Sequence, residues 1–200
     1  GALAFAAALC RRMFRLRQLT PAIFAHTMLG VAIHILPSGS TASPEAEVSP
    51  SYEIPPRRVP GSDSGYLEIL TKAIFQAGFS WAVIRDKWPN FRRAFDGFDV
   101  ETVANYGARD VDRLLSDPGI VRNGRKVEAT IQNARIMRDL IAEYGSIYNY
   151  LRSLDGLSYA ERRRRLTRRF HHLGPTGAFV FLYTVGEDVP DWEQRRAEDV

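Results

Sequence analysis

The stretch that decides the fold reads SYAERRRRLTRRFHHLGPTGAFVFLYTV and runs from Ser158 to Val185. It predicts two helices, Ser158–Phe170 and Pro175–Val185, joined by a short turn that contains Gly. This helix–hairpin–helix element leaves backbone N–H groups free where the second helix starts, and the helix dipole favours a phosphate there. An ordinary helical hairpin with a charged, exposed face is the alternative. On the first interpretation, four residues bind DNA: Arg168, Arg169, Gly174 and Thr176.

Outward from this hairpin, the chain from about residue 52 onward is helical as well. Apolar residues of the longest segment recur on one side with a 3.6-residue period, and no stretch alternates regularly enough to predict a strand. The fold class is therefore all-α, a compact multi-helix bundle that includes the helix–hairpin–helix element. The remaining expected helices are Tyr66–Ala77, Trp81–Trp88, Pro89–Phe95, Val100–Tyr106, Ala108–Ser116, Lys126–Tyr144 and Ser146–Ser153.

The first fifty residues differ in composition from the helical part. Residues 38–50 are rich in Ser, Pro, Ala and Glu, which is typical of a linker. We divide the chain into a variable or disordered N-terminal extension, residues 1–50, and a helical domain, residues 51–200. The apolar stretch between Pro21 and Pro37 is short for a membrane span. Translated upstream sequence, a targeting segment and an ordered extra helix stay open for the extension.

The composition narrows the classes of function. A formal net charge of +4 in 200 residues favours an anionic partner such as nucleic acid. The single cysteine, Cys10, excludes an intramolecular disulfide and a cysteine-rich zinc site, and it suits a reducing compartment. The four histidines form no HExxH-type pair, so we expect no metal.

A second basic group stands at the start of the long helix. Arg122, Arg125 and Lys126 follow a loop with glycines, and their charges oppose the dipole at a helix N-terminus. A DNA phosphate between them would relieve that conflict, and we predict that these three residues bind DNA. Ion pairing with acidic side chains such as Glu128 is the alternative.

An amide and an aromatic ring come close together where the first helix ends. Gln76 precedes Trp81 by five residues, across Gly78. A cavity for a flipped-out base needs an aromatic plane for stacking and a polar group that reads the base edge. Trp81 and Gln76 match these two needs. The alternative is that Trp81 packs in the core with Phe75 and Phe79.

Several segments together resemble 3-methyladenine DNA glycosylase I. Gln76–Trp81 (QAGFSW) resembles that family's QAGLSW motif, and Asn90–Asp99 (NFRRAFDGFD) resembles its FRxAFxxFD segment. Asp117–Lys126 and Asn133–Arg135 follow in the family's order. The resemblance covers about residues 66–189. It implies a helix–hairpin–helix glycosylase that acts on double-stranded DNA in the bacterial cytoplasm, as a monomer with no cofactor and no membrane.

Three features depart from the family's pattern. The family opens with a YHDxEWG-type segment that supplies aromatic walls, and residues 51–56 lack it, which leaves Tyr52 as the base-binding candidate there. The Cys and His residues that bind the family's zinc ion are missing from this sequence. In the C-terminal tail, Trp192 stands where the family has one of these ligands. The family's Glu that contacts the alkylated base, three residues before the motif Gln, is Ala73 here.

The resemblance implies a mechanism. 3-Methyladenine in DNA is cationic and leaves readily, so stacking of the flipped base on Trp81 and a hydrogen bond to Gln76 supply most of what is needed. Asp191 follows Gly174 at a spacing similar to that of the catalytic Asp of related glycosylases, and it completes the catalytic candidates. We expect a monofunctional DNA-3-methyladenine glycosylase that begins base-excision repair. A non-catalytic DNA-binding protein on the same fold is the alternative, favoured by Ala73.

Overall fold

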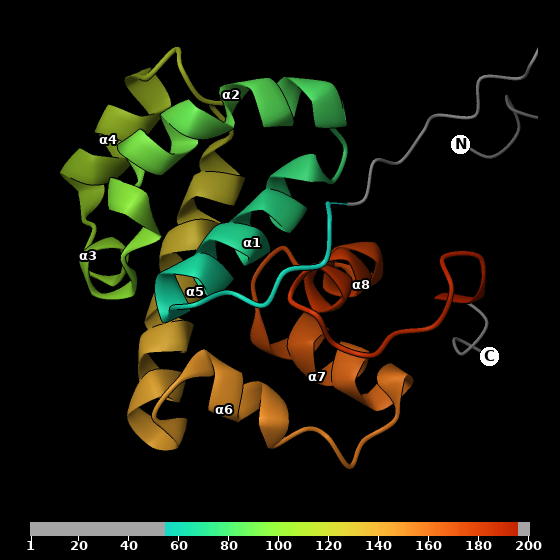
Figure 1. Cartoon of the computed structure of the whole chain (residues 1–200). Helices are drawn as coiled ribbons and strands as arrows, with labels where there is room; N and C mark the ends of the chain where they lie inside the picture. The colour runs from blue at the N-terminus through green and yellow to red at the C-terminus, as the bar shows by residue number, and fades with distance from the viewer. Residues whose placement is uncertain (1–54, 196–200) are drawn as a thin grey trace, which may run out of the picture. The chain divides into compact units, whose positions relative to one another are not determined.

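The computed structural model describes residues 55–195, and these residues form helices and loops without a strand (Figure 1). This confirms the all-α fold class. One element, α2, is longer than the sequence pattern predicts, as described below. The elements in chain order are α1 (Asp63–Gln76), α2 (Trp81–Ala94), the 3-10 helix η1 (Asp96–Phe98), α3 (Val100–Ala104), α4 (Ala108–Ser116), α5 (Gly124–Tyr144), α6 (Ile147–Arg152), α7 (Tyr159–Arg169) and α8 (Pro175–Thr184).

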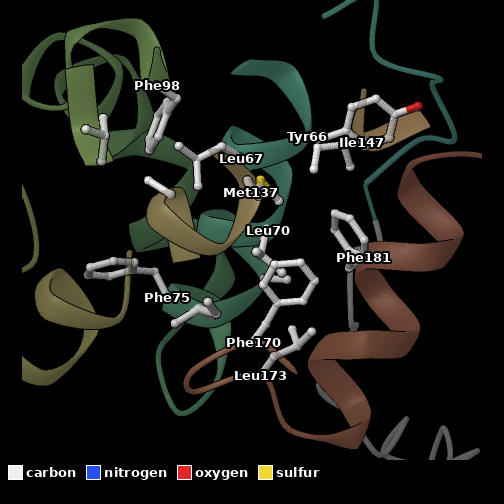
Figure 2. Close-up of a cluster of buried hydrophobic side chains, with 14 of the residues drawn as sticks. Tyr66, Leu67, Leu70, Phe75, Phe98, Met137, Ile147, Phe170, Leu173 and Phe181 are labelled. Carbon is white, nitrogen blue, oxygen red and sulfur yellow. The ribbon is translucent and has the colours of Figure 1, made fainter. Parts of the chain in front are cut away.

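Helices α1 and α5 pack against each other at the centre of the bundle. Helices α2, α3 and α4 lie on one side of this pair, and α6, α7 and α8 lie on the other (Figure 1). The buried side chains of both sides join into one core, because α1 and α5 contribute apolar residues in both directions. Figure 2 shows part of it, with Leu70 of α1, Met137 of α5 and Phe181 of α8.

Helix α2 corrects the sequence prediction. Two short helices were expected, Trp81–Trp88 and Pro89–Phe95, but one helix passes through Pro89. Proline removes one backbone donor from a helix interior, which usually ends or kinks the helix. Here Pro89 is exposed, and on the buried face the Trp88 ring stacks on the Phe91 ring with centroids 5.0 Å apart. Packing across the proline therefore keeps the helix continuous.

The second family-like segment is mostly structural. Its three phenylalanines, Phe91, Phe95 and Phe98, are fully buried, and neighbouring rings lie nearly parallel at 6.3 and 5.4 Å. Asp99 caps α3, because its Oδ1 accepts a hydrogen bond from the backbone N–H of Thr102 at 2.9 Å. The motif thus builds the aromatic core beneath α2 and starts the next helix.

A strap of residues 55–61 precedes α1 and is tied to the end of α8. The Arg58 backbone N–H donates to the Thr184 carbonyl at 2.7 Å. The Arg57 guanidinium donates to the carbonyls of Gly186 and Glu187 at 3.0 and 2.7 Å. These bonds join the start of the described chain to its last helix, and they place Pro55 beside α1 and α8.

Candidate active site and DNA-binding surface

A cavity of about 130 Å³ opens between α1, α2 and α8, and we call it the α1–α8 cavity. Five of its lining residues lie on one face of α1, at positions i, i+1, i+4, i+5 and i+8, as one side of a helix requires. Single residues or pairs from the strap, α2 and α8 complete the wall. The lining residues are Pro55, Glu68, Ile69, Lys72, Ala73, Gln76, Trp88, Val180 and Thr184.

Gln76 is the last residue of α1 and one of the residues that line this cavity. Its side chain lines the α1–α8 cavity and is only 5% exposed. Its Oε1 atom is buried and accepts no hydrogen bond from any residue between 55 and 195. A buried acceptor without a donor costs about 1–3 kcal/mol. A ligand that donates a hydrogen bond to Gln76 would recover this energy.

The aromatic wall of the cavity is Trp88. Its ring is stacked on Phe91 and on Phe98, at interplanar angles of 17° and 8°. Its Nε1–H donates to Glu68 Oε1 at 2.8 Å, and the same oxygen lies 3.3 Å from Arg92 Nε. The hydrogen bond of its Nε1–H and the stacking of its ring therefore hold the indole in one orientation, as a residue on which a base stacks requires.

Trp81 does not line this cavity. Its side chain is half-buried and packs at the edge of the core. Helix α2 begins at Trp81 and reaches the cavity two turns later, at Trp88, so the α1–α8 cavity places Trp88, and not Trp81, beside Gln76. Sequence reasoning missed Trp88 and Glu68. The available signal was the seven-residue spacing of Trp81 and Trp88, two turns along the helix expected for residues 81–88, which places Trp88 on the same side of that helix.

Asp191 and Tyr52 are the other two predicted site residues. Asp191 is exposed, and its backbone carbonyl accepts from the Gln194 N–H at 2.9 Å in a C-terminal turn. It is not among the residues that line the α1–α8 cavity. Tyr52 lies outside the described residues.

The hairpin between α7 and α8 has the predicted form. Both helices begin and end within a residue of the expected bounds, and Gly174 is the N-cap of α8, with Pro175 in the first turn. Gly174 is exposed, whereas Thr176 is half-buried. The side chain of Asn133 on α5 holds the turn: its Oδ1 accepts from the His171 N–H at 2.7 Å, and its Nδ2 donates to the His171 carbonyl at 3.0 Å.

The six arginines of α7 divide into two groups. Arg163 is buried and donates to the Arg195 carbonyl at 2.7 Å, and Arg162 donates to the Asp188 carbonyl at 2.7 Å. These two hold the C-terminal segment. The four exposed arginines are Arg164, Arg165, Arg168 and Arg169. Arg168 and Arg169 lie in the last turn of α7, directly before the hairpin.

The three residues of the second basic group, Arg122, Arg125 and Lys126, differ in their exposure to solvent. Arg122 and Arg125 are exposed at the start of α5. Lys126 is only 9% exposed, and its Nζ donates to the carbonyls of Phe75 and Ala77, at 3.2 and 2.5 Å. Lys126 thus satisfies carbonyls at the C-terminal end of α1. The prediction that Lys126 contacts DNA does not fit this placement, because α5 packs its first turn against α1.

Within residues 55–195, no three His, Cys, Asp or Glu side chains gather closely enough to hold a metal ion. The expectation of a metal-free protein stays a prediction. In the same range, no helix is both long enough and apolar enough to cross a membrane.

Solved structures similar to this one share its helical architecture. 3-Methyladenine DNA glycosylase I from Staphylococcus aureus superposes with a TM-score of 0.57 at 29% identity, over 64% of this chain and 79% of that chain. A variant of 3-methyladenine DNA glycosylase I in complex with 3-methyladenine gives 0.57 at 28%, over 64% and 80%. The fold is therefore that of the solved 3-methyladenine DNA glycosylase I structures.

Sequence comparison gives the family. A family model described as methyladenine glycosylase matches residues 58–172, more than half of the chain, and the chain belongs to this family. DNA-3-methyladenine glycosylase 1 of Escherichia coli (strain K12) is 42% identical over 78 residues, which are 38% of this chain and 42% of the relative. DNA-3-methyladenine glycosylase of Haemophilus influenzae is 37% identical over 60 residues, 30% of this chain and 32% of the relative. The aligned part thus spans less than half of each relative.

Proposed function

We propose that this protein is a monofunctional DNA glycosylase that excises 3-methyladenine from double-stranded DNA. The observation that carries the proposal is the buried Oε1 of Gln76, which has no hydrogen-bond partner among residues 55–195, in a cavity lined by the Trp88 ring. At about 130 Å³, the cavity is smaller than the roughly 300–1,000 Å³ of pockets for drug-sized ligands. That size favours a single flipped-out base.

In the proposed reaction, the base leaves the DNA stack and enters the α1–α8 cavity. Stacking on Trp88 offsets part of the cost of flipping, with a cation–π contribution for a charged base. The exocyclic amine of the adenine ring donates to Gln76 Oε1. Water then attacks C1′ as the N-glycosidic bond breaks, and the neighbouring DNA phosphates stabilise the positive charge that develops on the sugar.

The DNA would be held by the hairpin and by exposed arginines. The free N–H groups at the start of α8 suit a phosphate oxygen, and Arg168 and Arg169 stand directly before them. Arg122 and Arg125 extend the basic surface at the start of α5. The partner in this proposal is alkylated duplex DNA, bound by a monomer in the bacterial cytoplasm, and the bacterial origin of the curated relatives supports it.

A non-catalytic DNA-binding protein is the second candidate. It is favoured by Ala73, which lines the cavity where the resembled family carries a base-contacting Glu. Loss of a carboxylate beside a cationic base removes a large attraction. A protein without it could keep the hairpin and lose the excision reaction.

The deciding experiment measures release of free 3-methyladenine from methylated duplex DNA, with DNA binding measured in parallel. We expect release by the wild type and a roughly 10- to 100-fold fall for Gln76→Leu, since one lost interaction of 1–3 kcal/mol has that effect. Gln132→Leu, an exposed glutamine on α5, is the matched control and should keep the wild-type rate. Tight DNA binding without any base release would instead establish the non-catalytic candidate.

A further inference from the structure

A second cavity, of about 280 Å³, opens between α7 and the segment where α5 ends and α6 follows. It shares no lining residue with the α1–α8 cavity. One wall is basic and comes from α7, and the other contains two aromatic rings. The lining residues are Tyr144, Tyr150, Ser153, Leu154, Arg165, Arg168 and Arg169, and we call this cavity the arginine cleft.

The three arginines of the cleft lie at positions i, i+3 and i+4 of α7, so they share one face of the helix. All three are exposed, and no carboxylate of residues 55–195 forms an ion pair with any of them. Arg162 on the same helix, by contrast, pairs with Glu187. Like charges at this spacing repel each other, and an anion in the cleft would offset that repulsion.

The aromatic wall brings two of these charges toward one phenol. Tyr144 and Tyr150 pack edge to face with ring centroids 5.4 Å apart, and the Arg169 guanidinium lies 5.9 Å from the Tyr150 centroid. Burial raises the pKa of the Tyr150 hydroxyl, while Arg169 and Arg165 act to lower it. Glu143 also acts on this hydroxyl, but it is exposed and does not line the cleft. The lining therefore contains three cations and no carboxylate.

This set of side chains suits an anion with several acceptor oxygens. The guanidinium fork matches two oxygens of a phosphate at once, and phenol hydroxyls can donate as well. Arg168 and Arg169 stand in the last turn of α7, directly before the hairpin. A duplex held at the start of α8 carries further phosphates, spaced about 3.4 Å apart along the axis on each strand. The same DNA partner can therefore supply the anion of the cleft.

We propose that the arginine cleft is a second phosphate site, which binds a backbone phosphate of the duplex separate from the one at the start of α8. This rests on the DNA binding of the proposed function and requires no base release. The three guanidinium groups donate to the phosphate oxygens from the α7 side. Because every nucleotide carries the same phosphate, the cleft reads no sequence and fixes the position of the duplex on the protein.

The test measures affinity for one duplex at several salt concentrations and maps phosphate contacts by ethylation interference, in which ethylation of a contacted phosphate blocks binding. Arg165→Gln should lower affinity about 10-fold and reduce the slope of log affinity against log salt by about 0.9. It should also abolish interference at one phosphate, and Gly174→Asp should abolish it at a different one. Arg165→Lys keeps the charge without the fork, so it should keep the slope and lose part of the affinity.

Arg164→Gln is the matched control, because Arg164 is exposed on the same helix and does not line the cleft. The substitution changes the net charge by the same amount and should leave the slope and the interference pattern as in the wild type. Equal losses in Arg164→Gln and Arg165→Gln would show only the general field of α7 and would overturn the inference.

Melting temperatures with and without inorganic phosphate complete the test. Unchanged duplex affinity in Arg165→Gln would overturn the inference, and stabilisation of the wild type alone by inorganic phosphate would then assign the cleft to a free anion. Duplex binding that depends on Arg165, without release of 3-methyladenine, would reject the excision reaction and leave the second phosphate site standing. A wild type that binds no duplex would overturn both proposals.

Discussion

Arg125 and Lys126 are neighbours with the same charge, yet the structure gives them different surroundings. Arg125 is exposed, and Lys126 donates to two carbonyls at the end of α1. We expect Arg125→Gln to reduce the slope of log affinity for DNA against log salt by about 0.9, one phosphate contact, with no change in melting temperature. Lys126→Met should cost about 1–3 kcal/mol of stability and leave the slope unchanged. Binding at several salt concentrations and thermal unfolding check both, and exchanged outcomes would reverse the two assignments.

The two tryptophans of α2 give a second contrast. Trp81 packs at the core edge outside the cavity, so Trp81→Ala should lower stability by about 3 kcal/mol while the folded fraction keeps its turnover. Trp88→Leu should lower base release per folded molecule by about 10- to 100-fold, because it removes the stacking plane. Trp88→Phe keeps a plane and should keep most of the rate. A folded Trp81→Ala protein that releases no base would restore Trp81 to the site.

At the scale of elements, the hairpin offers a clean test because Gly174 has room around it. Its φ of −75° is open to any residue, and a Cβ added there would meet nothing within 4 Å. Gly174→Asp should therefore weaken binding to duplexes of every sequence by placing a negative charge at the phosphate site, without lowering the melting temperature. Gly174→Ser adds bulk without charge and should bind nearly as the wild type. Unchanged affinity in Gly174→Asp would make the hairpin structural only.

Helix ends with local signals were predictable, and helices decided by packing were not. Ser158 and Glu161 form a capping box, and Pro175 follows Gly174, so α7 and α8 were found within a residue. The course of α2 depends on aromatic stacking on both sides of Pro89, of Trp88 on Phe91 and on Phe98 of η1. A proline signal is local, and no local rule shows that tertiary contacts override it.

At the scale of the molecule, the strap of residues 55–61 marks how much of the N-terminal region can be deleted without loss of stability. We expect a chain that begins at Ser51 to fold and bind DNA as the full chain does, because the composition changes across residues 38–50. A chain that begins at Ser62 loses Pro55 from the cavity wall and the bonds from Arg57 and Arg58 to the end of α8. It should melt several degrees lower. Thermal unfolding of the two chains tests this, and a large fall already at Ser51 would show that the preceding residues contribute to the fold.

The cavity could be anticipated only in part, because three distant segments build it. Gln76 was found through its motif, but Lys72 and Glu68 lie on a helix whose periodicity shows only which face is apolar. That α8 would close over this face, and that Trp88 would meet it from α2, depends on the packing of the whole bundle. The residues that line a cavity between helices are therefore the hardest to predict from the sequence.

The way the work is divided between side chains and backbone affects how such proteins diverge. The polar groups that line the cavity lie mostly on successive turns of α1, whereas the start of α8 presents the N–H groups of its main chain. A substitution that keeps the turn does not remove main-chain groups. Under the proposed function, one or two substitutions on α1 would therefore change which lesion the cavity accepts and leave the contacts of the hairpin with DNA unchanged.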